Sequence, residues 1–217
     1  MSLSAVPAWA TEPIPGDSCS SYPENAVMRS GGPELGGAFY FLRCEGDIWV
    51  DITEILPADP CETGPVGTVC ASDGAVYAGT TVGGARMYVA AADEGGGYRY
   101  GGYGTDLNGN NSSVAPELRD DGLANTDWLL ANGEGDHDAA QACRDRGADW
   151  YLPAIDELGT LYANRAQLST ANLPTSTSWY WSSSESNFST ARIQRFSDGG
   201  QNLNGKNLTS LVRCVRR

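Results

Sequence analysis

The spacing of apolar and polar residues along the chain predicts a series of short β-strands. Residues 48–52 (IWVDI) and 191–196 (ARIQRF) alternate apolar with polar side chains, as half-buried strands do. In the aromatic run at 179–184, the same alternation would place Trp179 and Trp181 on one face and Tyr180 on the other. We expect further strands at 38–42, 75–79, 85–91 and 211–215. Turn sequences lie at 46–47, 83–84 and 197–200.

Apolar residues at helical spacing occur twice in the C-terminal half. From about residue 138 to residue 146, three alanines and Cys143 supply a small apolar face, and Gly147 is a natural stop. After Pro153, a second apolar face is formed by Ile155, Leu158, Leu161 and Tyr162. These patterns predict two helices, with a short helical turn at 125–130.

Residues 93–121 have almost no apolar periodicity, and a loop this long inside a compact domain is usually functional or mobile. Its glycine-rich part carries Tyr98, Tyr100 and Tyr103, whose rings offer a ligand contact area at low entropy cost. The alternative is a solvated loop that packs these tyrosines on the core. Both interpretations are open.

Charge and composition narrow the classes of partner. The chain has 217 residues and a net charge of -13, with its 27 acidic residues scattered rather than clustered. An acidic surface argues against nucleic acid and anionic membranes as partners. No apolar run approaches the roughly 20 residues that a membrane helix needs, so we expect no membrane insertion.

Six cysteines and a single histidine favour disulfides over a zinc site, because no close Cys-x-x-Cys pair is present. Disulfides imply an oxidising compartment, so we expect an extracellular, cell-surface or virion location. Cys61 and Cys70 lie in one turn-rich segment and are expected to pair locally. A bond between Cys19 and Cys44 would staple a small β unit at 19–56.

The expected organisation is a tail at 1–18, the small unit at 19–56 and a large domain at 61–217, with a proline-rich linker between the last two. Ala8-Trp9-Ala10 resembles the end of a secretory signal, although the basic start and apolar run of such a signal are missing. A trimmed signal and a chance match are both open interpretations.

Four sequence blocks follow one another in the last third of the chain. They are Trp150-Tyr151-Leu152-Pro153 followed by Glu157-Leu158, then Tyr180-Trp181-Ser182-Ser183-Ser184, Phe196 with Gly199, and Val212-Arg213-Cys214-Val215-Arg216. As a set they resemble the C-terminal domain of the collagen-like surface adhesins, a bacterial and phage family with a C-type-lectin fold. The resemblance covers roughly residues 69–217.

The resemblance implies an α+β fold: a C-type-lectin-like domain with two helices, an antiparallel sheet and long loops, preceded by the small disulfide-stapled β unit. It also implies that the helix cysteine pairs with the last strand, as Cys143–Cys214. The loop of about 70 residues closed by that bond would contribute roughly 4 kcal/mol on a chain-entropy estimate. In the family, the residue after the proline is often Ser or Thr. Here Ala154 leaves half of a capping box, which should cost about 1 kcal/mol.

No enzyme motif is present, and we expect a binding protein rather than a catalyst. Adjacent Asp156 and Glu157 would point about 100° apart on a helix and could not face each other as an acid–base pair. The candidate binding surface is the polar hairpin at 186–209, where amides can both donate and accept hydrogen bonds. Its predicted contact residues are Asn187, Phe188, Gln194, Gln201, Asn202, Asn204, Lys206 and Asn207. An ordinary polar hairpin is the alternative.

Asp106-x-Asn108-x-Asn110 resembles the start of a calcium loop with oxygen ligands, and an Asn-Gly turn is the competing interpretation. We expect no other cofactor. The residue triplets typical of calcium-dependent sugar-binding lectins do not occur, so calcium-mediated sugar binding is not expected.

Two functions follow from these patterns. The first is an adhesion module, displayed on a cell surface, a secreted fibre or a phage particle, that binds a glycan or protein receptor through its loops. The second is a structural subunit or decoration domain of a filament or virion, whose main partner is its own homo-oligomeric assembly.

Overall fold

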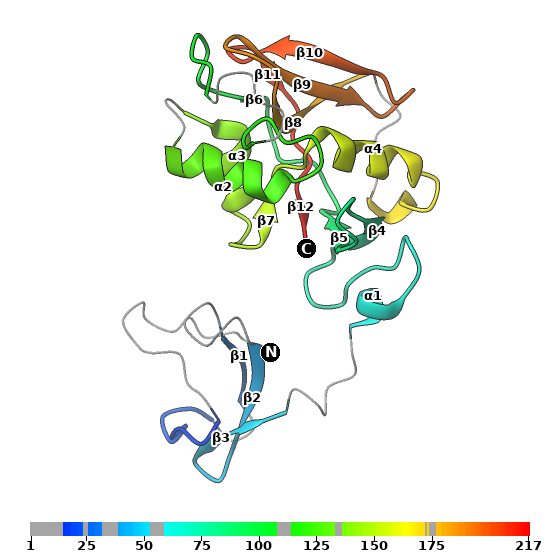
Figure 1. Ribbon diagram of the computed structural model, residues 1–217. Helices are drawn as coiled ribbons and strands as arrows, with labels where there is room; N and C mark the ends of the chain where they lie inside the picture. The colour runs from blue at the N-terminus through cyan, green and yellow to red at the C-terminus, as the bar shows by residue number, and fades with distance from the viewer. Residues whose placement is uncertain are drawn as a thin grey trace. The chain divides into compact units, whose positions relative to one another are not determined.

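The computed structural model describes residues 15–23, 26–31, 39–52, 59–107, 114–132, 136–171, 173 and 177–217. The chain divides into two compact units, Met1–Ala58 and Asp59–Arg217, and each is described by itself (Figure 1). All pairings between the named strands are antiparallel.

The small unit is a three-stranded sheet in the order β1 (Val27–Gly31), β2 (Phe39–Glu45), β3 (Ile48–Asp51). Gly46 and Asp47 both have positive φ, 57° and 66°, which suits the tight turn predicted between β2 and β3. Trp49 is buried on one side of β3 and meets the ring of Tyr22 edge-on, with ring centroids 5.2 Å apart. The core of this unit therefore depends on one tryptophan beside one disulfide.

The described residues of the large unit form three sheets. The first has the order β4 (Val76–Thr80), β5 (Arg86–Val89), β12 (Val215–Arg216), β7 (Trp150–Tyr151). The second has the order β10 (Gln201–Gly205), β9 (Thr190–Arg195), β8 (Trp179–Glu185). The third pairs β11 (Thr209–Ser210) with β6 (Tyr98–Arg99).

The described residues contain four α-helices rather than the two that were expected. They are α1 (Pro60–Thr63), α2 (Gly122–Asn132), α3 (Asp138–Arg144) and α4 (Ile155–Ala163), with a 3-10 turn at Ser169–Ala171. The sequence indicated only a short turn where α2 lies, because polar Asn125 and Thr126 occupy its buried face. Their side chains bond the backbone oxygens of Leu118 and Leu152, which is how a helix with weak apolar periodicity is anchored.

The closing strand is shorter than the predicted 211–215 and forms a ladder only at β12. The backbone before it bonds several segments instead of one neighbour: Leu211 pairs with β8, the Val212 oxygen accepts from Glu94, and the Cys214 oxygen accepts from Ala90. Arg213 is buried and donates to the Ala90 and Ala171 oxygens. This stretch therefore joins several parts of the large unit.

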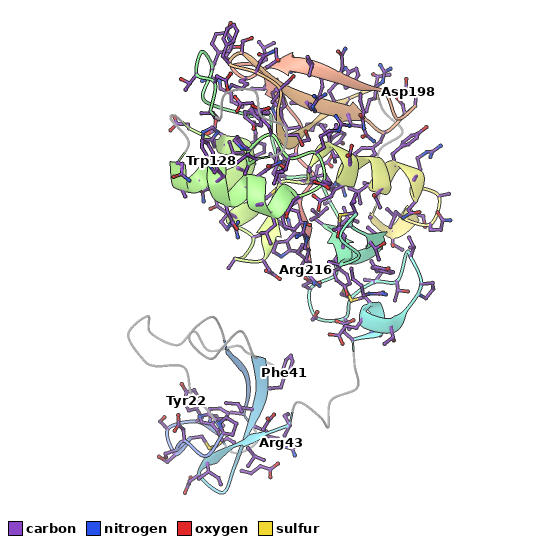
Figure 2. The ribbon with its side chains drawn as sticks, in the orientation of Figure 1. Tyr22, Phe41, Arg43, Trp128, Asp198 and Arg216 are labelled. Atoms are coloured by element: carbon purple, nitrogen blue, oxygen red, sulfur yellow. A yellow bond between two sulfur atoms is a disulfide. The ribbon has the colours of Figure 1, made fainter. Side chains whose placement is uncertain are left out.

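All six cysteines are bonded in the expected pairs, Cys19–Cys44, Cys61–Cys70 and Cys143–Cys214 (Figure 2). Cys143 on α3 and Cys214 are both completely buried in one apolar cluster with Trp181 and Leu152. A second cluster lies between the β4–β7 sheet, α4 and the opposite face of β8, where Tyr180 meets Phe196. Trp181 and Tyr180 thus point into different clusters, as the alternation predicted.

The acidic residue of the first sequence block, Glu157, connects four segments of the large unit. It accepts hydrogen bonds from the backbone nitrogens of Ala154 (2.8 Å) and Gly122 (3.1 Å) and from the Tyr151 hydroxyl (3.0 Å). It also forms an ion pair with Arg217 at 3.1 Å. Burial raises the pKa of the Glu157 carboxyl above its usual range. This residue holds the frame together and is not exposed for chemistry.

Residues of two other sequence blocks also make packing contacts inside the large unit. Ser184 donates to the Leu118 oxygen at 2.6 Å and accepts from the backbone of Ile155, so β8 is tied to the start of α4. Gly199 has φ of 75°, and a Cβ there would lie 2.4 Å from the ring of Tyr162. No larger residue fits that turn without displacing the tyrosine.

Candidate ligand-binding groove

The two faces of the β10–β9–β8 sheet differ in what covers them. Figure 1 shows α4 lying against one of them. On that face, Gln194 donates to the Leu158 oxygen of α4 at 3.0 Å, and Gln201 donates to Gln194 at 2.9 Å. The register pairs Asn202 with Ile193 and Ile193 with Trp181, so these side chains share the opposite face.

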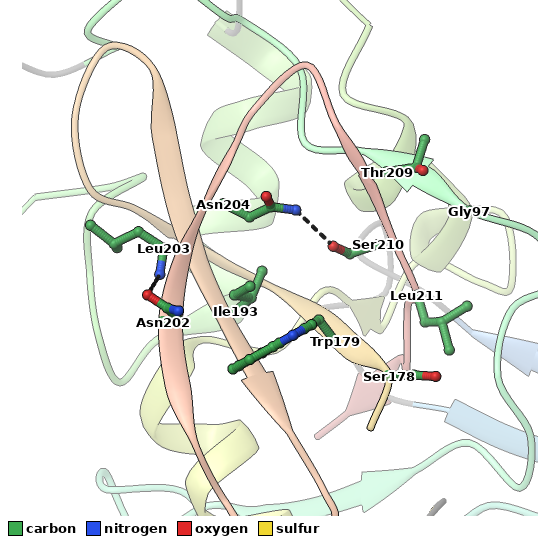
Figure 3. A pocket seen from close by; sticks show the side chains of 10 residues that line it. All are labelled: Gly97, Ser178, Trp179, Ile193, Asn202, Leu203, Asn204, Thr209, Ser210 and Leu211. Carbon is green, nitrogen blue, oxygen red and sulfur yellow. Dashed lines mark hydrogen bonds between the residues drawn. The ribbon is translucent and has the colours of Figure 1, made fainter. Parts of the chain in front are cut away.

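A groove of about 430 Å³ opens on this second face, between β10 and the segment that includes β11 (Figure 3). Its lining comes from β8, β9, β10 and β11 and from the loop before β6. The lining residues are Gly97, Ser178, Trp179, Ile193, Asn202, Leu203, Asn204, Thr209, Ser210 and Leu211. Its volume lies in the lower part of the range of about 300–1,000 Å³ that is typical of small-ligand sites.

The floor of the groove is apolar. Trp179, at the start of β8, is half-buried, and Ile193 of β9 lies beside it (Figure 3). The Arg195 guanidinium stacks 4.7 Å from the centroid of the Trp179 ring and is also paired with Asp198. The cation thus holds the indole in place, and its own charge is balanced by a carboxylate.

The walls carry amides and hydroxyls. Asn204 donates to the Ser210 hydroxyl at 3.2 Å across the groove, and the Asn202 side-chain oxygen accepts from the Leu203 backbone at 2.8 Å (Figure 3). Within the described part of the chain, the Asn202 amide nitrogen, the Asn204 side-chain oxygen and the Thr209 hydroxyl make no hydrogen bond. A ligand here meets one donor, one acceptor and one group that can do either. None of the lining side chains titrates near neutral pH.

Of the predicted contact residues, the structure places Asn202 and Asn204 in the groove. Three others lie in the interior with their polar atoms bonded to protein: Tyr100 to the Ser183 oxygen, Gln194 to α4, and Lys206 to Glu185. We leave these three out of the proposed site.

The remaining predicted contacts lie outside the groove lining. Gln201 bonds the covered face, the Asn187 oxygen caps its own turn by accepting from Ser189 and Thr190, and the Tyr98 hydroxyl donates to Gly95. Phe188, Tyr103 and Asn207 are exposed. Trp179 packs partly against the core and also lines the groove. Its position at the first residue of a strand was the available sign that one edge of the ring would be accessible.

Asp106, the first residue of the calcium-like sequence, lies close to two other carboxylates, Glu117 and Glu185. Asn108 and Asn110 fall outside the described residues. A second group, Asp59 with Cys61 and Cys70, is not available to a metal because its two cysteines form a disulfide and Asp59 caps α1. Among the described helices, none is long and apolar enough to cross a membrane.

Comparison with known proteins gives a match to a family model and similarity to solved structures. No curated protein matches the chain. A fimbrial protein from Bacteroides ovatus, known from a crystal structure, is similar at 16% identity and a TM-score of 0.41 over 61% of this chain. The similar region spans 36% of that protein's chain, so the chain covers about a third of its length. This similarity is too low to carry an argument.

Residues 113–216 match the model of a family described as the Lcl C-terminal domain. The matched segment holds all four sequence blocks noted above and every groove-lining residue except Gly97. It makes up just under half of the chain. The match supports the assignment of residues 113–216 to the Lcl C-terminal domain family.

Proposed function

We propose that this chain is a non-enzymatic adhesion module that binds a neutral glycan in the groove between β10 and β11. The observation that carries the proposal is that the Trp179 indole and the side chains of Asn202, Asn204 and Ser210 line one groove (Figure 3). We further propose that the large unit has the C-type-lectin-like fold implied by its sequence blocks, and that it is displayed on a cell surface, a secreted fibre or a phage particle.

A sugar matches this arrangement chemically. A pyranose ring has an apolar face of C–H groups, which packs on an aromatic ring, and a rim of hydroxyls. Each hydroxyl both donates and accepts, and carboxamides offer both functions in a fixed plane. A groove that combines one aromatic floor with two carboxamides and two hydroxyls is therefore suited to a sugar residue.

The charge of the protein favours a neutral glycan over an acidic one. The net charge of -13 repels polyanions at long range. Arg195, the cation that stacks on Trp179, is already paired with Asp198. The three disulfides are consistent with an oxidising compartment, where such a module would meet extracellular glycans.

The test is a glycan array followed by calorimetry on the glycan bound best. We expect Trp179→Ala to lower affinity by more than tenfold, and Asn202→Ala and Asn204→Ala to lower it by roughly 2–10-fold each, the range for one hydrogen bond. Asn207→Ala is the matched control, because this exposed asparagine lies in the same hairpin outside the groove. An equal loss in Asn207→Ala would contradict the proposed site. A blank array, with a protein receptor bound and lost in Asn202→Ala, would assign the groove to a protein.

A second candidate, self-assembly, is favoured by a different observation. β10 is an edge strand of its sheet, and Leu203 on it is 43% exposed. Leu208 and Phe188, in the adjoining turns, are 53% and 56% exposed. Light scattering tests this candidate: a mass above the 23.0 kDa of one chain that returns to 23.0 kDa in Leu203→Lys would support assembly through this edge.

A further inference from the structure

Three carboxyl groups from two distant parts of the sequence converge inside the large unit. Oxygens of Asp106, Glu117 and Glu185 all lie within 4.8 Å of one another. Glu117 is 4% exposed and Glu185 is 1% exposed, while Asp106 is partly buried. Like charges at this distance and depth repel strongly unless something neutralises them.

One lysine neutralises only part of this negative charge. Lys206 is completely buried, forms an ion pair with Glu185 Oε1 and donates to the Thr105 backbone oxygen at 2.8 Å. Arg192 acts on Glu117 at longer range and makes no salt bridge within the described residues. Negative charge therefore remains in excess in a site that excludes most water.

A separate observation points to a missing ligand. Glu185 Oε1 contacts both Lys206 and the Leu107 backbone nitrogen, but Glu185 Oε2 is buried and has no hydrogen-bond partner among the described residues. The Glu185 side chain is 0% exposed, so bulk water does not solvate this oxygen. Buried carboxylate oxygens in folded proteins are normally bonded to a donor or a cation.

We propose that Asp106, Glu117 and Glu185 bind one Ca²⁺ ion. Carboxylate oxygens are the ligands that calcium prefers, and none of the three residues offers the nitrogen or sulfur that favours zinc. Oxygens within 4.8 Å of one another fit around a common centre at the usual calcium–oxygen distance of about 2.3–2.6 Å. The ion offsets the excess negative charge and gives Glu185 Oε2 its partner.

The ion would connect the loop at 93–121, through Asp106 and Glu117, to β8, through Glu185. Lys206 extends the same network to the turn after β10, the strand that carries Asn202 and Asn204. Because two of the three carboxylates are buried, the ion supports the frame and is not a direct sugar ligand. The proposal does not depend on glycan binding.

Terbium luminescence on the full chain tests the proposed Ca²⁺ site, with Tb³⁺ as the probe and Ca²⁺ as the competitor. The Tyr100 ring lies 5.8 Å from Lys206 Nζ and 5.7 Å from the Trp181 ring, so aromatic side chains are close enough to sensitise a bound lanthanide. We expect emission that Ca²⁺ displaces, with a Kd between about 10⁻⁵ and 10⁻³ M. At about 100 times the Kd, Ca²⁺ should raise Tm by about 5–10 °C.

The variants Asp106→Asn and Glu117→Gln leave the Glu185–Lys206 pair intact and should each weaken Ca²⁺ binding by at least tenfold. Asp120→Asn is the matched control, because Asp120 is an exposed carboxylate three residues from Glu117. In EDTA, Glu117→Gln should be at least as stable as the parent chain, since it removes a like charge, while in Ca²⁺ it should be less stable. No Ca²⁺-dependent emission or Tm shift in the parent chain, or an equal loss of binding in Asp120→Asn, would overturn the proposal.

Discussion

The two faces of the β10–β9–β8 sheet carry the same kind of side chain in different surroundings. Gln194 and Gln201 lie on the face against α4, where their amides bond each other and helix backbone oxygens. Asn202 and Asn204 lie on the other face, where a groove takes the place of a helix. Four amides in two neighbouring strands thus divide into two that hold the fold together and two that a ligand can reach. A cluster of polar residues becomes a candidate site only where nothing covers it.

The sequence blocks and the groove residues differ in the same way: the blocks are covered and the groove residues are accessible. Glu157 and the serines of β8 are buried and bonded to protein. Trp179 comes immediately before the aromatic block, and Asn202 and Asn204 lie between the last two blocks. The sequence blocks therefore build the frame, and residues outside the blocks line the groove.

The largest expected effect is on the covered side, where Glu157→Ala should lower the free energy of unfolding by about 3–5 kcal/mol. The change leaves Arg217 without its buried carboxylate partner and two backbone nitrogens without an acceptor. Urea unfolding followed by tryptophan fluorescence measures the loss.

The neighbouring carboxylate provides the control for this loss. Asp156 forms a half-exposed ion pair with Arg119, so Asp156→Ala should cost only about 0–1 kcal/mol. If the two variants lost similar stability, Glu157 would not be the connection that holds α4 in place.

A second prediction compares one amide from each face of the sheet. Gln194→Ala should lower the free energy of unfolding by about 1–3 kcal/mol, because it removes the donor to the Leu158 oxygen inside the core. Asn204→Ala should lower stability by at most about 1 kcal/mol, since its side chain is only partly buried and makes one hydrogen bond, to the Ser210 hydroxyl. Glycan affinity should respond in the opposite order, falling in Asn204→Ala and staying unchanged in Gln194→Ala. Equal responses in both assays would remove the distinction between the faces.

The contacts of each residue explain which parts of the fold could be predicted from the sequence. Strands and helices with regular apolar spacing, such as β9 and α4, were predicted close to their observed positions, because local burial is periodic. The three disulfides were also predicted correctly. The helix α2 was underestimated, since Asn125 and Thr126 are buried through hydrogen bonds to distant backbone atoms, which no local pattern reveals.

The candidate site was harder to predict for the same reason. Asn, Gln and Lys in one hairpin look equally accessible in sequence, yet Gln194 and Lys206 point inward and Asn202 and Asn204 point outward. Strand register and the position of α4 decide between them, and both depend on contacts across the chain. The approach of Glu185 to Asp106 and Glu117 is likewise a tertiary contact, because β8 is far from their loop in sequence.

The smallest predicted effect is a dependence on pH. It distinguishes the two faces of the sheet, because a titratable carboxyl lies near the covered face and none lines the groove. The pKa of Glu157 is raised by burial, so the folded state holds its proton more tightly than the unfolded state does. Its contribution to stability is then greatest below the unfolded pKa and decreases as pH rises toward the folded pKa. Each unit of pKa elevation corresponds to about 1.4 kcal/mol. The stability of Glu157→Gln relative to the parent chain should therefore improve as the pH rises from 4 to 7.

The open face should not respond to the same change in pH. No groove-lining side chain titrates in this range, so glycan affinity, measured by calorimetry on the folded parent chain, should stay within about twofold from pH 5 to pH 8. Asp156→Asn is the stability control, because it changes the neighbouring carboxylate, which is half-exposed and paired with Arg119. An affinity that followed the stability curve would mean that the groove is coupled to the buried carboxylate beneath α4. The two faces would then act as one unit, and the independence on which the groove assignment rests would be lost.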